Sequence, residues 1–288
     1  MRIIVTGGAG FIGSALVRHL VAAGRDVLTV DALTYAGNRA SLRDVEDNPR
    51  HRFLHADICD RAAMDSAMAE FRPDRVMHLA AESHVDRSIT GAADFIQTNV
   101  VGTFTLLEAA RVAWLGSRKR DDVRFHHVST DEVFGSLTES DPPFSETTPY
   151  APNSPYSASK AGSDHLARAY HHTYGLPVTV TNCSNNYGPY QHAEKFIPTV
   201  IRSALAERPI PIYGAGLNIR DWLYVADHCK AIDAAVRSGT NGETYLIGGR
   251  SERRNIDIAN EICSILDQRS PRKIGSYAEL LTSVTDRL

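Results

Sequence analysis

The stretch RIIVTGGAGFIG, residues 2–13, decides the fold. A short β-branched run leads directly into Gly7, Gly10 and Gly13, and a helical pattern begins at Phe11. Glycines at this spacing let the chain turn sharply after a strand, approach a pyrophosphate closely and pack the next helix against the strand. The helix N-terminus adds free N–H groups and a positive dipole, which attract phosphate. The stretch therefore predicts a βαβ unit that binds a dinucleotide.

An acidic residue at the end of the second predicted strand indicates which dinucleotide is bound. Glycine loops also form ordinary tight turns, and Asp31 on its own is equally a loop residue or a helix cap. At this distance from the glycines, however, a carboxylate can accept hydrogen bonds from ribose hydroxyls. A 2′-phosphate about 4 Å away would be repelled by about 4 kcal/mol at an effective dielectric of about 20, and no arginine follows to offset this repulsion. The expected cofactor is therefore NAD rather than NADP.

Outward from this unit, short β-branched runs alternate with longer segments of helical periodicity. This alternation is typical of a parallel sheet with crossover helices. The predicted strands are Arg2–Thr6, Val27–Val30, Phe53–His55, Val76–Leu79, Phe125–Ser129 and Val178–Thr181. The predicted helices are Phe11–Ala23, which ends at a capping Gly24, Ala93–Ala113 and Pro155–Tyr174. The expected fold class is α/β, a Rossmann-type doubly wound parallel sheet with a smaller C-terminal substrate-binding lobe.

The C-terminal part of the sequence has a different character. After about Asn182 the regular alternation ends, and prolines and glycines become frequent. Such a composition favours loops and short elements. We expect an NAD-binding Rossmann domain over residues 1–182 and a mainly substrate-binding lobe over residues 183–288, interleaved with the first. Ligands of such folds bind at the carboxyl edge of the sheet, over which this lobe is expected to lie.

The composition argues against several classes of protein. The 288 residues carry a formal net charge of -3, which gives no broad positive field for nucleic acid or an anionic membrane. No apolar run approaches the roughly 18 residues of a membrane span, and no basic, apolar leader precedes the first strand, so we expect no membrane partner and a cytoplasmic location. The 4 cysteines are widely spaced and the 12 histidines show no paired-ligand pattern. We expect reduced thiols and no metal.

A second motif, YSASK, runs from Tyr156 to Lys160 at the start of a predicted helix. Residues four apart lie on one helical face, so the phenol and the ammonium can point into the same space. Such pairs also occur by chance on solvated helices, but this one follows a strand whose terminal hydroxyls, including Thr130, would face it across the nicotinamide position. A tyrosine with an ordinary pKa near 10 needs about 4 kcal/mol of phenolate stabilisation to act as a base at neutral pH. A nearby ammonium can supply this in a partly dry site.

Two adjacent carboxylates, Asp131 and Glu132, follow the same strand. An isolated Asp-Glu pair is ordinarily a helix cap or a solvated acidic turn. Beside a hydride-transfer site another function is favoured, because elimination of water needs one group to take a proton from carbon and a second to protonate the departing hydroxyl. A simple dehydrogenase has no use for both carboxyl groups. The pair therefore predicts a dehydratase.

Taken together, the sequence resembles the dTDP-glucose 4,6-dehydratases of the extended short-chain dehydrogenase/reductase superfamily, over essentially its whole length. The matching stretches are VTGGAGFIGSALVRHL, VDALTYAGN, LAAESHVDRSI, NVVGTFTLLEAAR, VSTDEVFGSL, PYSASKAGSDHLARAYHHTYGLPVTVTNCSNNYGPYQHAEKFIP and PIYGAGLNIRDWLYVADH. VDALTYAGN and STDEVFG are the most specific, because related epimerases and decarboxylases usually lack the Asp-Glu pair. The resemblance implies NAD as cofactor, dTDP-glucose or a related nucleotide sugar as substrate, and a homodimer.

The resemblance also assigns individual positions. Those that match the surroundings of NAD are Gly7, Gly10, Phe11, Ile12, Gly13, Asp31, Ala32, Leu33, Thr34, Asp57, Ile58, Leu79, Ala80, Ala81, Thr98, Tyr156, Lys160 and Asn186. Those that match the surroundings of the sugar nucleotide are Ser83, Thr130, Asn185, Lys195, Phe196, Pro211, Ile212, Tyr213, Arg220 and Asn255.

The implied catalytic residues are Thr130, Asp131, Glu132, Tyr156 and Lys160. Tyr156 would take the C4 hydroxyl proton, Glu132 the C5 proton, and Asp131 would protonate the C6 hydroxyl as it leaves. Two alternatives stay open. One is an NAD-dependent sugar-nucleotide epimerase or decarboxylase. The other is an NAD-binding protein without turnover, because the resemblance implies a further diphosphate-gripping stretch after the last residues of this sequence.

Overall fold

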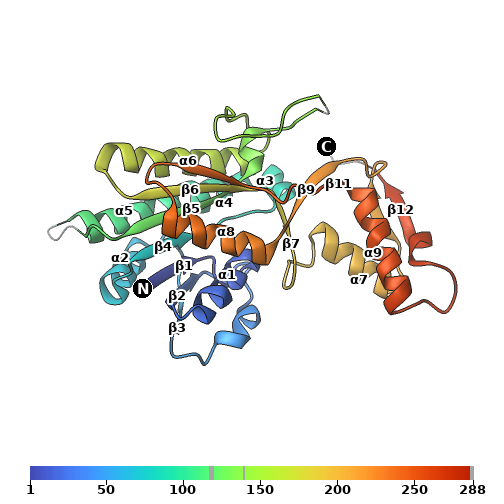
Figure 1. The fold of residues 1–288 in the computed structure, drawn as a ribbon, viewed down its shortest axis with the longest axis horizontal. Coiled ribbons are helices and arrows are strands. Elements are labelled where there is room, and N and C mark those ends of the chain that lie inside the picture. The colour runs from blue at the N-terminus through green and yellow to red at the C-terminus, as the bar shows by residue number, and fades with distance from the viewer. Residues whose placement is uncertain (117–119, 139, 286–288) are drawn as a thin grey trace. The chain divides into compact units, whose positions relative to one another are not determined.

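The computed structural model describes residues 1–116, 120–138 and 140–285 (Figure 1). The chain forms two compact units. The first comprises residues 1–183 and 225–247, and the second comprises residues 184–224 and 248–288. The first unit thus takes in a helix and a strand from the range that the sequence led us to expect in the C-terminal lobe.

The first unit is built on a sheet of seven parallel strands in the order β10-β6-β5-β4-β1-β2-β3. The strands are β1 (Arg2–Thr6), β2 (Asp26–Asp31), β3 (His51–His55), β4 (Arg75–His78), β5 (Arg124–Thr130), β6 (Val178–Cys183) and β10 (Thr244–Ile247). From β3 to β6 this is the doubly wound dinucleotide-binding order, whose direction of winding reverses between β1 and β4. The expected fold class is confirmed.

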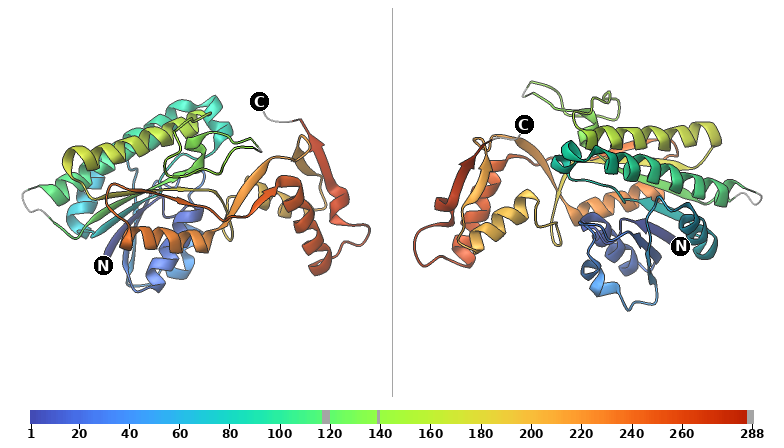
Figure 2. Two further views of the ribbon diagram at one scale, coloured as in Figure 1. Left: turned by 45° about the horizontal axis from the view of Figure 1, so that its top comes forward. Right: turned by 180° about the vertical axis from the view of Figure 1, so that it is seen from behind.

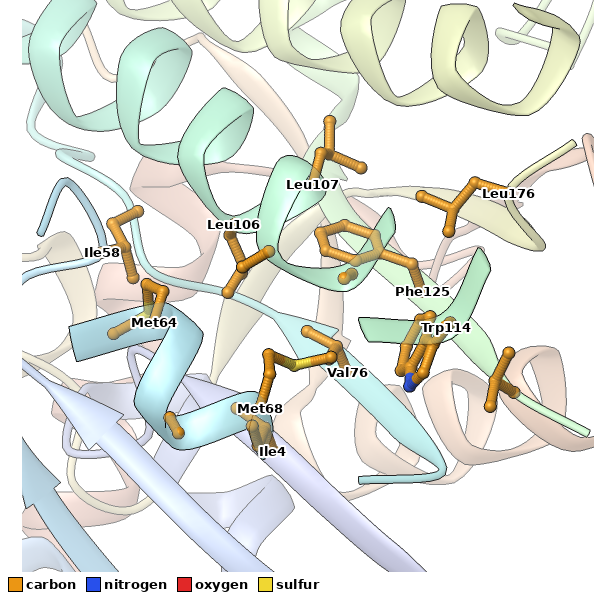
Figure 3. Close-up of a cluster of buried hydrophobic side chains, with 14 of the residues drawn as sticks. Ile4, Ile58, Met64, Met68, Val76, Leu106, Leu107, Trp114, Phe125 and Leu176 are labelled. Carbon is orange, nitrogen blue, oxygen red and sulfur yellow. The ribbon is translucent and has the colours of Figure 1, made fainter. Parts of the chain in front are cut away.

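Helices cover both faces of this sheet (Figures 1 and 2). One face carries α2 (Arg61–Phe71), α5 (Thr103–Leu115) and α6 (Pro155–Tyr174), and the other carries α1 (Phe11–Ala22), α8 (Val225–Ser238) and the 3-10 helix η1 (Arg39–Val45). Successive residues of a strand point to opposite faces. Ile4 accordingly packs under α2 and α5 (Figure 3), while Ile3 and Val5 pack under α1 and α8.

The predicted helix Ala93–Ala113 is wrong as a single α-helix. The chain forms α3 (Val85–Thr90), α4 (Ala92–Phe95), a π-helical segment η2 (Ile96–Gly102) and only then α5. The wide turn draws Asn99 inward, where its side chain donates to the Glu82 carbonyl at 3.0 Å and accepts from the Glu82 amide at 2.8 Å. Single-turn π segments of this kind are common at functional sites.

The helix α6 begins and ends where the sequence predicted. Ser154 and Ser157 form a reciprocal capping box, with Pro155 in the first helical position. Gly175 then ends the helix in the left-handed region, at a φ of 69°. The capping box and Pro155 fix the first turn of α6, which carries Tyr156.

The second unit has a separate core of Val200, Ala204, Ile210, Ala259 and Cys263. Its elements are β7 (Asn185–Tyr187), α7 (Phe196–Leu205), β8 (Ile210–Tyr213), β9 (Ile219–Tyr224), β11 (Glu252–Arg254), α9 (Asn255–Arg269), the 3-10 helix η4 (Tyr277–Leu280) and β12 (Leu281–Val284). β7, β9 and β11 form one sheet, and β8 pairs with β12. The resemblance implied a further diphosphate-binding stretch after the last residues of the sequence, and residues 286–288 lie outside the described range.

Among residues 1–116, 120–138 and 140–285, no helix combines the length and the apolar character needed to span a bilayer. These residues also contain no group of three or more His, Cys, Asp or Glu side chains arranged to hold a metal ion.

Candidate active site

The glycine turn after β1 packs against the loop that follows β4. Gly7 has a φ of 67°, and a Cβ on it would lie 2.6 Å from the Ala80 amide nitrogen. A Cβ on Gly13 would overlap the Gly7 carbonyl, so α1 can approach the turn only with glycine at that position. A Cβ on Gly10 would meet only the Gly7 oxygen, at 3.2 Å, and is otherwise in open space. The open side of the turn therefore lies at the N-terminus of α1, where unpaired amides can receive a pyrophosphate.

Asp31 ends β2 with its carboxylate held in place by backbone amides. Its Oδ2 accepts from the Ala9 amide at 2.9 Å and its Oδ1 from the Leu33 amide at 2.8 Å. These bonds tie the acid to the glycine turn itself and leave further lone pairs on both oxygens. An oriented carboxylate beside the turn fits the ribose of a dinucleotide, so the donor and acceptor groups present suit NAD.

The remaining first-unit positions expected around NAD follow the carboxyl ends of neighbouring strands. Ala32, Leu33 and Thr34 follow β2, Asp57 and Ile58 follow β3, Leu79, Ala80 and Ala81 follow β4, and Thr98 lies in η2. The Ile58 side chain is only 3% exposed and belongs to the hydrophobic core, which leaves its backbone for any ligand contact. Asn186 lies on β7, in the second unit.

The turn after β5 brings the predicted acid pair next to a hydroxyl. Thr130 caps the short 3-10 helix η3 (Asp131–Phe134), and its Oγ1 accepts from the Glu132 amide at 3.2 Å. The same hydroxyl lies 3.4 Å from Asp131 Oδ1. Asp131 is half-buried and Glu132 is exposed. The two adjacent carboxyl groups therefore have different surroundings, as two distinct proton-transfer roles would need.

Tyr156 lies within reach of this turn. Its ring is 9% exposed and packs edge-on against Phe95, with 6.2 Å between ring centroids. Burial raises its pKa well above the ordinary value, and the carboxylates of Glu132 and Asp131 raise it further, while a hydrogen bond with the Thr130 side chain opposes them. The acid pair thus acts electrostatically on Tyr156. In the chain by itself the phenol stays protonated, so the phenolate that the sequence led us to expect depends on further positive charge.

Lys160, on the next turn of α6, is the residue that the sequence led us to expect as a source of such charge. Its side chain is 4% exposed, and Nζ donates to the Val128 carbonyl of β5 at 2.9 Å. The carbonyl holds the ammonium at the same edge of the sheet at which Thr130 ends β5.

Sequence reasoning missed a polar network beneath these groups. Thr6 Oγ1 lies 2.7 Å from His78 Nδ1, and His78 Nε2 lies 2.9 Å from Thr103 Oγ1. Asn99 donates to Ser159 Oγ at 2.8 Å and so links η2 to α6. Asn99, Thr103 and Ser159 belong to helical segments that were predicted from their apolar periodicity. That periodicity does not indicate which polar residues point inward.

Eight of the ten positions expected around the sugar nucleotide lie in the second unit, and Ser83 and Thr130 lie in the first. Within the second unit, Asn185 on β7 pairs in register with Trp222 on β9, whose ring lies 6.1 Å from that of Phe196. Tyr213 and Arg220 are exposed, while Ile212 is 4% exposed and packs in the core of this unit. The others are Lys195, which caps α7, Pro211 on β8, and Asn255, which begins α9.

The doubly wound sheet, the glycine turn and the Tyr156/Lys160 pair define an extended short-chain dehydrogenase/reductase. The family model described as "GDP-mannose 4,6 dehydratase" matches residues 4–283. A dTDP-glucose 4,6-dehydratase of Neisseria meningitidis is 58% identical over 99% of this chain and 82% of its own length. Another of Escherichia coli K12 is 60% identical over 100% of this chain and 82% of its own. The chain belongs to the dTDP-glucose 4,6-dehydratase family.

A solved structure of the same family has the same fold. DesIV, a dTDP-glucose 4,6-dehydratase from Streptomyces venezuelae, was solved with NAD and TYD bound. It is 46% identical and superposes with a TM-score of 0.89 over 100% of this chain and 85% of its own. A UDP-glucose 4-epimerase of Thermus thermophilus, solved with NAD, is more distant, at 28% identity and a TM-score of 0.84.

Proposed function

We propose that this protein is an NAD-dependent dehydratase that converts dTDP-glucose into dTDP-4-keto-6-deoxyglucose. The observation that carries the proposal is the acid pair, because Asp131 and Glu132 are close enough to Tyr156 to raise the pKa of its phenol. Family membership supports the same activity, since relatives at 58% and 60% identity are dTDP-glucose 4,6-dehydratases.

NAD is the cofactor that the first unit suits. Gly7, Gly10, Gly13 and the α1 amides would receive its pyrophosphate and Asp31 a ribose, and the structural relative DesIV was solved with NAD bound. When bound, NAD would supply the hydride acceptor for C4 of the hexose and, once reduced, the hydride donor for C6. Lys160 would hold the nicotinamide ribose, and its ammonium would favour the phenolate of Tyr156.

The side chains then divide the proton transfers. Tyr156 accepts the proton of the C4 hydroxyl as that carbon is oxidised, while Thr130 orients the hydroxyl. The resulting ketone acidifies the C5 hydrogen, which Glu132 removes. Asp131 protonates the C6 hydroxyl, which leaves as water. A proton returned to C5 completes the 4-keto-6-deoxy sugar.

An epimerase or a decarboxylase would need the glycine turn, Tyr156 and Lys160, but neither needs two acids beside them. The half-buried Asp131 and the exposed Glu132 therefore favour the dehydratase. An NAD-binding protein without turnover leaves the same acid pair without a function.

The recognition of the nucleotide is also a proposal. We assign it to the second-unit positions Asn185, Lys195, Phe196, Pro211, Ile212, Tyr213, Arg220 and Asn255, together with Ser83 of the first unit. The exposed guanidinium of Arg220 is the group best suited to a diphosphate oxygen.

We further propose a homodimer and a cytoplasmic location. Exposed apolar side chains on η2, α5 and α6 support the dimer, among them Phe104 at 46%, Val112 at 49% and Tyr174 at 50%. None of the four cysteines forms a disulfide bond, which suits a reducing compartment. Phe104→Glu should weaken the dimer, which light scattering after gel filtration would detect as monomer, and a dimer unchanged by this substitution would place the interface elsewhere.

Turnover of dTDP-glucose tests the function directly. In alkali the 4-keto sugar of the product gives an additional ultraviolet band at wavelengths beyond the absorbance of the thymine base, and neither the substrate nor the product of C4 epimerisation gives this band. We expect this absorbance with dTDP-glucose, and its loss in Tyr156→Phe. A folded, NAD-loaded protein that gives only the C4 epimer, or releases carbon dioxide from a uronic acid analogue, would contradict the proposal.

A further inference from the structure

A carboxylate that takes no part in the proposed reaction lies one turn beyond Lys160. Asp164 is 0% exposed and lies on the same face of α6 as Tyr156 and Lys160. Burial of a carboxylate is costly unless it is hydrogen-bonded and paired with opposite charge. Asp164 therefore needs a physical explanation.

Three donors surround this carboxylate. His127 Nε2 lies 3.0 Å from Oδ1, while the Tyr150 hydroxyl at 2.9 Å and Asn182 Nδ2 at 3.1 Å donate to Oδ2. Burial alone would raise the pKa of Asp164, but the His127 hydrogen bond and the Lys160 charge outweigh it and hold the pKa below its usual value. Asp164 is thus a fully buried anion.

The charge of this anion acts on Lys160. Burial lowers the pKa of Lys160, and the Asp164 charge is the largest influence that opposes it. Burial also lowers the pKa values of His127 and His78, so both imidazoles are neutral and add no positive charge. Cys183, on β6, has a smaller effect in the same direction as Asp164.

The same carboxylate is joined to the end of β5. Asn182 Nδ2, which donates to Asp164, also donates to the Thr130 carbonyl at 3.0 Å. Thr130 begins the turn that carries Asp131 and Glu132. A single buried carboxylate is therefore linked through Asn182 to the strand end that holds the acid pair, and it lies one helical turn from the lysine.

We propose that Asp164 is a positioning residue, which keeps Lys160 an ammonium beside Tyr156 and, through Asn182, fixes the end of β5. The catalytic benefit of this charge rests on the proposed function, but the charge coupling itself does not. The other charged or titratable groups around Asp164 are His127 on β5, Tyr150 before α6, and Arg168, which donates to the Tyr150 hydroxyl at 3.1 Å. His78 on β4 packs against the His127 ring.

Direct titration of Lys160 tests the coupling without any substrate. The sequence contains five lysines, so protein labelled with carbon-13 at lysine Cε gives few signals, and Lys160→Met assigns the one that matters. In Asp164→Asn we expect the Lys160 midpoint to fall by one pH unit or more, a tenfold or greater loss of proton affinity. The other lysine midpoints should not move. A Lys160 midpoint equal to that of the wild type in folded Asp164→Asn would overturn the proposal.

Two further variants separate charge from structure. Asp164→Glu keeps the charge and should hold the midpoint near that of the wild type. Glu108→Gln removes a half-buried carboxylate of α5 that pairs with Arg111, and it should leave the Lys160 midpoint unchanged. If the midpoint falls as far in Glu108→Gln as in Asp164→Asn, the effect is not specific to Asp164 and the proposal fails.

A stability comparison covers the case in which Asp164→Asn does not fold. Removal of one member of a buried charge pair leaves the other uncompensated, so Lys160→Met added to Asp164→Asn should restore stability. A double variant no more stable than Asp164→Asn alone would overturn the proposal. Because none of these measurements uses dTDP-glucose, they can fail while the proposed turnover stands, and turnover can fail while the coupling stands.

Discussion

At the scale of single residues, the two adjacent acids after β5 have different surroundings. Asp131 is half-buried and lies beside the Thr130 hydroxyl, while Glu132 is exposed and its backbone amide is bound by the same hydroxyl. In the proposed mechanism, hydride transfer from C4 needs only Tyr156 and Lys160, whereas loss of water needs both acids. The two half-reactions can therefore be separated by substitution.

We predict that Glu132→Gln retains the first oxidation but loses overall dehydration by roughly a hundred- to ten-thousand-fold, the range for a lost general base. Rapid mixing with dTDP-glucose should show reduced nicotinamide accumulating on the enzyme, because oxidation proceeds and elimination does not. Tyr156→Phe is the matched control and should show no reduced cofactor. Equal accumulation in both variants, or none in either, would contradict the division of roles.

A second prediction concerns Asp31. Its replacement by alanine removes the buried carboxylate that we propose accepts hydrogen bonds from the ribose hydroxyls, so we expect NAD to bind about ten- to a hundredfold more weakly. Calorimetric titration would measure the change. Asp26→Ala is the control, since Asp26 lies at the opposite end of β2 in an exposed pair with Arg50. NAD affinity that falls equally in both variants would show a general effect on the strand.

At the scale of elements, the sequence predicted what local patterns determine. The first six strands and α6 follow from alternating or periodic apolar residues, and all were found within two residues of their expected ends. β10 was missed because its four residues acquire their strand character only by pairing with β6. The π-helical segment was missed because it depends on the contacts of Asn99 with Glu82 and Ser159, which lie far away in the sequence.

The same distinction applies to the candidate site. Gly7, Asp31, Tyr156 and the acid pair could be predicted, because each occupies a fixed place relative to a strand or helix end. The Asp164 network could not, because its partners come from β5, β6 and the loop before α6. Sequence spacing determines which residues share an element, and only the packed sheet brings different elements together.

We predict opposite effects for two Gly-to-Ala substitutions in helices. In Gly13→Ala the new methyl group would overlap the Gly7 carbonyl, so α1 must move away from the glycine turn and both NAD binding and stability should fall. In Gly162→Ala the new methyl group would lie 3.6 Å from Val100 Cγ2, an ordinary contact, and helix propensity should raise stability by up to about 1 kcal/mol. Thermal melts with and without NAD measure both. A Gly13→Ala protein that binds NAD normally would contradict the close packing.

At the scale of the whole molecule, buried histidines determine how stability responds to acid. Burial lowers the pKa of five of them: His51, His78, His126, His127 and His228. For His126 burial, reinforced by neighbouring positive charge, lowers the pKa to about 3, and for His228 burial alone lowers it to about 4. Below pH 6.5 the unfolded chain binds protons at these sites and the folded chain does not, so acid favours unfolding. Above pH 6.5 these histidines are mostly neutral in the unfolded chain as well, so protonation no longer opposes folding.

The last prediction follows from that sign. As the pH falls from 6.5 to about 4, His228 alone should lower the free energy of unfolding by up to about 1.4 kcal/mol per pH unit. His228→Leu should therefore reduce the slope of this free energy against pH by about that amount, whether the substitution itself stabilises or destabilises the protein. The two tryptophans lie in different units, and in a Trp222→Phe background the buried Trp114 reports on the first unit, which contains His228. Urea titrations at pH 7, 6 and 5 and one protein concentration would give the slope. His172→Leu, which replaces an exposed histidine of α6, is the matched control for the loss of one imidazole. A slope that is the same in wild type and His228→Leu would show that His228 takes up its proton in the folded protein as readily as in the unfolded chain.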